Sequence, residues 1–87
     1  MGTFVISYDL VKTKDYEALF EKIKSYGTWS HPLLSTWVVV TNKSAIQIRD
    51  DLLTTLDDDD RLFIVESSGN SSWKNVRCRT EWLQKYM

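Results

Sequence analysis

The chain has 87 residues, a net charge of −1 and 43% hydrophobic residues. This length predicts one domain over residues 1–87, and the low glycine and proline content with many aromatic residues argues against disorder. No apolar run approaches the roughly 20 residues of a membrane span, and the first residues lack the pattern of a signal peptide. Cys78 is the single cysteine, which excludes an internal disulfide and predicts a half-buried, reduced thiol. We therefore expect a cytoplasmic protein without a membrane segment.

Residues 3–10 alternate in the manner of a β-strand with one buried face. Phe4, Ile6 and Tyr8 point to one side of this strand, and the intervening side chains point to the other side. The second set ends with Asp9, a carboxylate that a strand does not need for its own stability. The position of Asp9 is therefore a candidate for function.

A helical period replaces the alternation over residues 14–26, whose apolar side chains fall on one stripe. Thr13 is the expected cap of this helix, and Asp15 in the first turn suits the positive end of the helix dipole. Gly27 follows the last apolar position and is expected to end the helix.

Strand character returns over residues 28–41, with a break at Ser35 that divides it into strands 28–34 and 36–41. Pro32 has no amide hydrogen to donate, so its strand is expected at an edge of the sheet. The run TWVVVT in the second of these strands is apolar enough to lie centrally.

A second helix is expected to begin at Ser44, which forms a capping box with Gln47. Four aspartates at 57–60 should lie beyond its end, because acids are unfavourable at a helix C-terminus. Their contiguous spacing, without a glycine, favours a solvated turn over a calcium loop. A fourth strand is expected over residues 61–67. The helix is expected to bury a stripe made of Ala45, Ile48, Leu52 and Leu56, with Leu53 beside it.

The order strand, helix, strand, strand, helix, strand predicts an α+β fold of the split βαβ, ferredoxin-like kind. In that arrangement the first and third strands are central in an antiparallel sheet, and both helices cover one face. The other face is left bare, and a second copy of the chain is the simplest cover for it. We therefore expect a homodimer.

The C-terminal segment, residues 70–87, is basic and carries three positive charges in excess, so residues 1–69 carry −4. Residues 75–80 alternate, which predicts a fifth short strand, and Thr80 can then cap a last helical turn. In a dimer this segment is a candidate for exchange onto the sheet of the other copy.

Three cations of this segment, Lys74, Arg77 and Arg79, lie between Trp73 and Trp82. Cations neutralise phosphates and indole rings stack on bases, so these residues are candidates for contact with RNA or DNA. The alternative is that the tryptophan rings fasten the segment to the rest of the domain. His31, the single histidine, is expected to pack near Trp29 on an edge strand.

Asp9 offers a second candidate site, because two copies of it would meet if the bare face formed a two-fold interface. Two carboxylates in proximity repel one another unless a proton or cation lies between them. Magnesium accepts one or two carboxylates and keeps several waters, which can attack a phosphodiester. The alternative is that Asp9 caps the strand or the following loop by a backbone hydrogen bond.

The stretches FVISYDL, LLSTWVVV and DRLFIVES, with a glycine-terminated helix between the first two, resemble the small CRISPR-associated protein 2 family and its virulence-associated protein D relatives. The resemblance covers residues 3–67, and its motif is Tyr8-Asp9. It implies a ferredoxin-like homodimer whose C-terminal strand crosses to the other protomer. It also implies a metal-dependent nuclease or a subunit of the spacer-integration machinery. Carried over, the metal-binding catalytic role falls on Asp9.

The chain departs from the family pattern at Pro32, in its acidic body and in its four tryptophans. Two functions are therefore carried forward from the sequence. The first is a homodimeric, nucleic-acid-associated protein with an Asp9 magnesium site, acting as an endonuclease or as a partner in an adaptation complex. The second is a non-enzymatic dimer that serves as an interaction or small-ligand-binding module.

Overall fold

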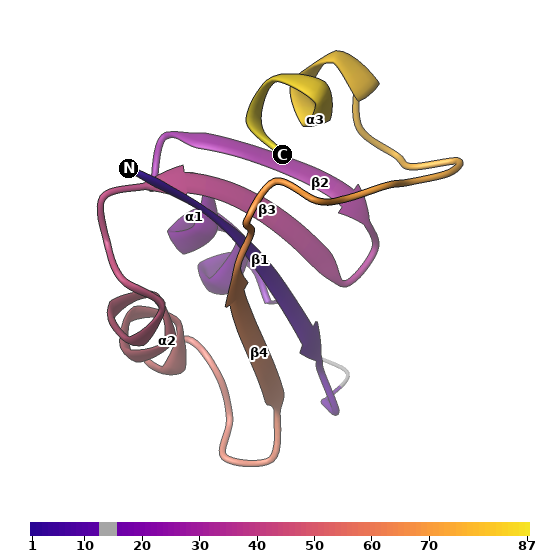
Figure 1. The fold of residues 1–87 in the computed structure, drawn as a ribbon. Helices are drawn as coiled ribbons and strands as arrows, with labels where there is room; N and C mark the ends of the chain where they lie inside the picture. The colour runs from indigo at the N-terminus through magenta and orange to yellow at the C-terminus, as the bar shows by residue number, and fades with distance from the viewer. Residues whose placement is uncertain (13–15) are drawn as a thin grey trace.

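The computed structural model of the protein describes residues 1–12 and 16–87 and arranges them as one sheet with three helices (Figure 1). The described elements in chain order are β1 Gly2–Asp9, α1 Glu17–Lys24, β2 Thr28–Leu33, β3 Thr36–Thr41, α2 Ala45–Leu53, β4 Arg61–Glu66 and α3 Thr80–Tyr86. The α+β class expected from the sequence is confirmed.

The four strands lie in the order β2-β3-β1-β4, and every neighbouring pair is antiparallel. As predicted, the first and third strands are central and the second and fourth are edges. Pro32 lies on the edge strand β2, where its missing amide hydrogen costs the sheet no ladder bond. The pairing of β2 with β3 is irregular between Ser30 and Leu33, next to this proline.

One face of the sheet and the helices α1 and α2 enclose the core. The core contains Phe4, Ile6 and Tyr8 of β1, Trp37 and Val39 of β3, Leu19 and Ile23 of α1, and Ile48 and Leu52 of α2. The expectation that both helices cover the same face is therefore confirmed. Burial of each large apolar side chain in this core stabilises the fold by roughly 1.5–3 kcal/mol.

Helix α1 begins at Glu17, with Tyr16 as a non-helical N-cap residue that makes no side-chain capping bond. The expected cap Thr13 and the first-turn acid Asp15 lie outside the described residues. Gly27 follows the helix with a φ of 99°, a left-handed conformation that glycine adopts without strain. The helix itself ends at Lys24 with Ser25 as its C-cap residue, two residues before the predicted last residue Tyr26.

Helix α2 has the predicted capping box, in which Ser44 and Gln47 each accept the other's backbone N–H. The four aspartates follow the helix in a turn, as expected, but Asp60 is not simply solvated. Its carboxylate accepts hydrogen bonds from the backbone N–H of Val11 at 3.0 Å and the hydroxyl of Tyr16 at 2.9 Å. The turn is therefore tied to Val11, just after β1, and to Tyr16, just before α1.

The prediction of a fifth strand over residues 75–80 is wrong, because the structure has no strand there. Asn75 has a φ of 54°, which breaks the extended backbone that a strand requires. A single backbone bond, from the N–H of Arg77 to the carbonyl of Pro32 at 2.8 Å, joins the segment to the edge of β2. The short helix is confirmed, although α3 begins after Arg79 as its N-cap residue rather than after Thr80.

The segment after β4 crosses the sheet toward β2 and then turns back as α3 (Figure 1). Leu83 of α3 is buried, and with Trp73 and Val76 it faces Val5 and Val38 on the second sheet face. The expectation of a wholly bare second face is therefore wrong. The chain's own C-terminal segment covers the half of this face that contains Val38.

The half of the second face at β4 keeps its exposed apolar side chains. Phe63 is 68% exposed and Val65 is 45% exposed. Through the sheet register, Phe63 lies beside Ser7, and Val65 lies beside Val5. We call this uncovered strip, made of Ser7, Asp9, Arg61, Phe63 and Val65, the β4 face.

Candidate functional site

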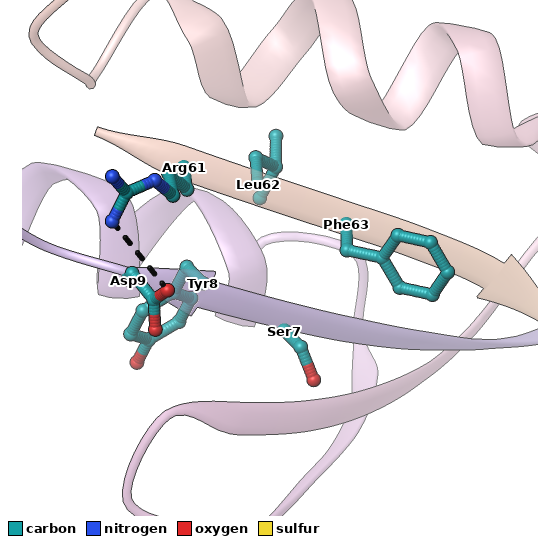
Figure 2. Close-up of a pocket in the computed structure, with 6 residues that line it drawn as sticks. All are labelled: Ser7, Tyr8, Asp9, Arg61, Leu62 and Phe63. Atoms are coloured by element: carbon teal, nitrogen blue, oxygen red, sulfur yellow. Dashed lines mark ion pairs between the residues drawn. The ribbon is translucent and has the colours of Figure 1, made fainter. Parts of the chain in front are cut away.

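The end of β1 and the start of β4 form a shallow pocket of about 280 Å³ on the β4 face (Figure 2). The antiparallel register places Asp9 opposite Arg61 and Ser7 opposite Phe63. A carboxylate, a guanidinium, a hydroxyl and a phenyl ring therefore share one small exposed area. The remaining lining residues are Tyr8 and Leu62.

Asp9 is accessible, because 73% of its side chain is exposed. Its ion pair with Arg61 is long, 3.9 Å between Oδ2 and Nη1, and the arginine side chain is itself 75% exposed. A solvent-screened pair of this kind contributes little to stability. The carboxylate is therefore able to exchange Arg61 for another cation at small cost, and Arg61 is able to turn to an anion.

Ser7 is already engaged, since its hydroxyl lies 2.9 Å from the hydroxyl of Thr36 on β3. It is placed on the same face as Asp9 but is a weak candidate for binding metal. Among residues 1–12 and 16–87, no three histidine, cysteine, aspartate or glutamate side chains gather as a metal site. Among the residues that line this pocket, Asp9 is the one that carries a carboxylate.

The three cations predicted for nucleic-acid contact are all exposed, but the structure brings only two of them together. Arg77 and Arg79 line a groove of about 350 Å³ along the free edge of β2, and Lys74 is not part of its lining. The other lining residues are Trp29, Ser30, His31, Cys78 and Trp82. We call this the β2 groove.

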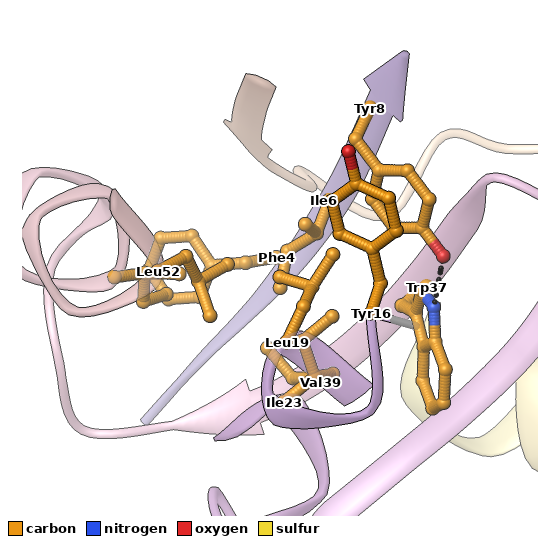
Figure 3. Close-up of a cluster of buried hydrophobic side chains, with 10 residues drawn as sticks. Phe4, Ile6, Tyr8, Tyr16, Leu19, Ile23, Trp37, Val39 and Leu52 are labelled. Atoms are coloured by element: carbon orange, nitrogen blue, oxygen red, sulfur yellow. Dashed lines mark hydrogen bonds between the residues drawn. The ribbon is translucent and has the colours of Figure 1, made fainter. Parts of the chain in front are cut away.

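Stacked rings support the β2 groove from the core side. The ring of His31 lies 3.9 Å from that of Trp37 at an interplanar angle of 12°, and Trp29 lies 5.2 Å from the same indole. Trp37 donates its Nε1–H to the hydroxyl of Tyr8 at 2.9 Å (Figure 3). Trp37 is buried, so the groove has a floor with little freedom to move. The expected packing of His31 near Trp29 involves Trp37 as the common partner.

Sequence reasoning missed Arg61 as the neighbour of Asp9, and Trp29 and His31 as neighbours of Arg77. The stretch DRLFIVES could be placed as the strand beside β1 from the sequence. Pairing Arg61 with Asp9 also needs the register between the two strands, which the sequence does not give. The β2 groove joins residues about 50 positions apart, which no local pattern encodes.

Comparison with family models, with curated proteins and with solved structures finds no match to this chain. Within the described part of the chain, every helix is too short or too polar to cross a membrane.

Proposed function

We propose that the protein is a homodimer of ferredoxin-like fold that associates with nucleic acid and resembles the CRISPR-associated protein 2 family. In this proposal Asp9 from each copy binds a shared Mg²⁺ and the dimer cleaves phosphodiesters. The order β2-β3-β1-β4, with α1 and α2 against one face, supports the ferredoxin-like assignment.

The observation that carries the proposal is the place of Asp9 on the β4 face. An exposed carboxylate ends a central strand next to Phe63, which is 68% exposed and lacks cover from the C-terminal segment. A two-fold contact uses the same patch on both copies. Packing the two β4 faces together would bury both Phe63 rings and bring the two Asp9 carboxylates near the axis.

Two carboxylates near an axis favour a bound cation, because their mutual repulsion is relieved by the positive charge. A bound Mg²⁺ would supply activated water and charge neutralisation at a phosphodiester. Arg61 lies within reach of the same point and can hold a phosphate oxygen, since its guanidinium suits that geometry. The roles are thus Asp9 for metal binding and Arg61 for positioning of the substrate.

One observation favours the second candidate, a dimer without enzymatic activity. Arg61 already places a positive charge 3.9 Å from Asp9, so two copies could meet without a metal ion. In this alternative the pair Asp9 and Arg61 serves as a polar contact between protomers, and the same face is an interaction module.

Cleavage assays on Asp9→Asn separate the two candidates. Labelled RNA and DNA are incubated with wild-type protein and Mg²⁺ or Mn²⁺, and with Asp50→Asn as the matched control. Asp50 is also an exposed acid paired with an arginine, at 2.9 Å from Arg49, but it lies on α2. The proposal expects cleavage by wild type and by Asp50→Asn, and none by Asp9→Asn. Wild-type protein that cleaves neither polymer would favour the non-enzymatic dimer. An Asp9→Asn variant that still cleaves would rule out the metal role of Asp9.

A further inference from the structure

The β2 groove is separate from the β4 face and combines one exposed indole, Trp29, and one half-buried indole, Trp82, with two cations. Trp29 on β2 forms one wall; it is 38% exposed and packs on Trp37. The ammonium of Lys24 lies 5.4 Å from the centre of the Trp29 ring, which adds positive charge at this wall. The buried floor holds Trp29 in place, so a ligand ring would meet a surface that is already ordered.

The opposite wall comes from the C-terminal segment, and Trp82 of α3 provides its ring. Trp82 is half-buried and lies 4.7 Å from Tyr86, which restricts its rotation. The backbone bond from Arg77 to Pro32 fixes this wall against the edge of β2. Glu81 of α3 lies 3.7 Å from Arg79, and both side chains are largely exposed.

The chemistry of these walls fits an unpaired nucleotide. An indole face stacks on any nucleobase, and guanidinium groups neutralise the phosphates on either side of it. The volume of about 350 Å³ lies at the lower end of the roughly 300–1,000 Å³ typical of ligand pockets, which suits one base. Bases in a duplex already stack on their neighbours, so a duplex could offer the groove phosphates but no free ring face.

We propose that the β2 groove binds single-stranded RNA or DNA, with one base stacked on Trp29 or Trp82 and its flanking phosphates on Arg77 and Arg79. The inference rests on the nucleic-acid association proposed above and adds that the bound form is single-stranded. It also predicts that Lys74, which lies outside the groove, contributes less to binding than Arg77 and Arg79.

The indole signals of the wild-type protein test this without any substitution. In a ¹⁵N-labelled sample the four indole N–H groups are followed as a mixed-sequence 12-nucleotide strand, or the same sequence as a duplex, is added. The single strand should shift the signals of Trp29 and Trp82 and leave that of the buried Trp37 in place. Shifts that are equal with the duplex, or absent from both Trp29 and Trp82, would overturn the proposal.

Substitutions in the groove test how much its residues contribute to the affinity for single-stranded nucleic acid. Trp82→Leu should weaken single-strand binding about tenfold, since one base–aromatic stack is lost, and Trp82→Tyr should restore most of it. Arg77→Gln with Arg79→Gln should flatten the salt dependence by about 0.7 log units per lost phosphate contact. The control, Lys22→Gln with Arg49→Gln, removes the same charge from α1 and α2. It should change the affinity and its salt dependence by less than the double arginine variant does. Equal losses in the arginine variant and the control would overturn the assignment to the groove.

The outcomes also separate this inference from the proposed function. Protein that binds duplex and single strand equally, with Trp82→Leu unaffected, would overturn the groove and leave nucleic-acid association standing. Protein that binds neither form at low salt would overturn both.

Discussion

The indole N–H of Trp37 donates to the hydroxyl of Tyr8 across 2.9 Å, and both side chains are buried between the sheet and α1 (Figure 3). Burial raises the pKa of the Tyr8 hydroxyl, and the hydrogen bond from Trp37 opposes that shift. This contact joins β3, which supports the floor of the β2 groove, to β1, which ends at Asp9. The two candidate sites therefore share one ordered core.

Replacement of Tyr8 by phenylalanine should destabilise the protein by about 1–3 kcal/mol, because the buried Trp37 N–H loses its acceptor. Urea denaturation followed by circular dichroism measures this change. Tyr86→Phe, on the half-exposed face of α3, is the matched control and should change stability by less than about 0.5 kcal/mol. Equal stability of Tyr8→Phe and wild type would contradict the hydrogen bond.

Truncation of Leu83 to alanine should lower the free energy of unfolding by about 2–4 kcal/mol, because Leu83 is 3% exposed where α3 covers the sheet. Leu34→Ala is the control, since that side chain is 72% exposed and should be nearly neutral. Thermal and urea unfolding measure the stability of both variants. A neutral Leu83→Ala would mean that the C-terminal segment does not pack on its own sheet in solution.

Replacement of Phe63 by serine should weaken a dimer formed through the β4 face. Each copy would lose an apolar contact of roughly 1.5–3 kcal/mol, and because the dimer loses two such contacts, its dissociation constant should rise at least about a hundredfold. Sedimentation equilibrium distinguishes the dimer from the 10.2 kDa chain. Leu53→Ser, at an exposed position of α2, should leave the constant unchanged. A wild-type monomer at high concentration would exclude this interface.

Acid stability should depend on Asp51. The hydrogen bond from the Tyr26 hydroxyl at 3.0 Å, with the Lys43 ammonium at 3.3 Å, holds the pKa of Asp51 below its usual value of 3.8. Because the pKa is lower in the folded state, Asp51 contributes stability above its unfolded pKa, and this is lost as the pH falls through the folded pKa. Asp51→Asn should therefore be less stable than wild type at pH 7, with the difference disappearing as the pH falls through the lowered pKa of the folded state. A pH-independent difference in the unfolding free energy would rule out this coupling.

Local patterns predicted much of the fold. The alternation of Phe4, Ile6 and Tyr8 identified the buried face of β1, and the Ser44–Gln47 box identified the start of α2. Pro32 identified an edge strand because a missing donor is a property of that residue alone. These features depend on a few neighbouring residues, so a single sequence contains them.

The contacts that form the sites depend on long-range placement. Val76 and Cys78 alternate as in a strand, but the left-handed Asn75 and the apolar sheet face opposite Leu83 decide their conformation. The pairing of Asp9 with Arg61 follows from a register that one residue of slippage would change. Asp9 could thus be singled out from the sequence, whereas its charged neighbour could not.

Metal stoichiometry tests the central claim, a site shared by two Asp9 side chains, most directly. Mn²⁺ is titrated into the protein at a concentration where sedimentation shows a dimer, and free Mn²⁺ is measured by electron paramagnetic resonance. We predict one strongly bound ion for every two chains, lost in Asp9→Asn and retained in Asp50→Asn, with the dimer intact in both variants. One ion per chain, or binding that survives Asp9→Asn, would contradict the shared site.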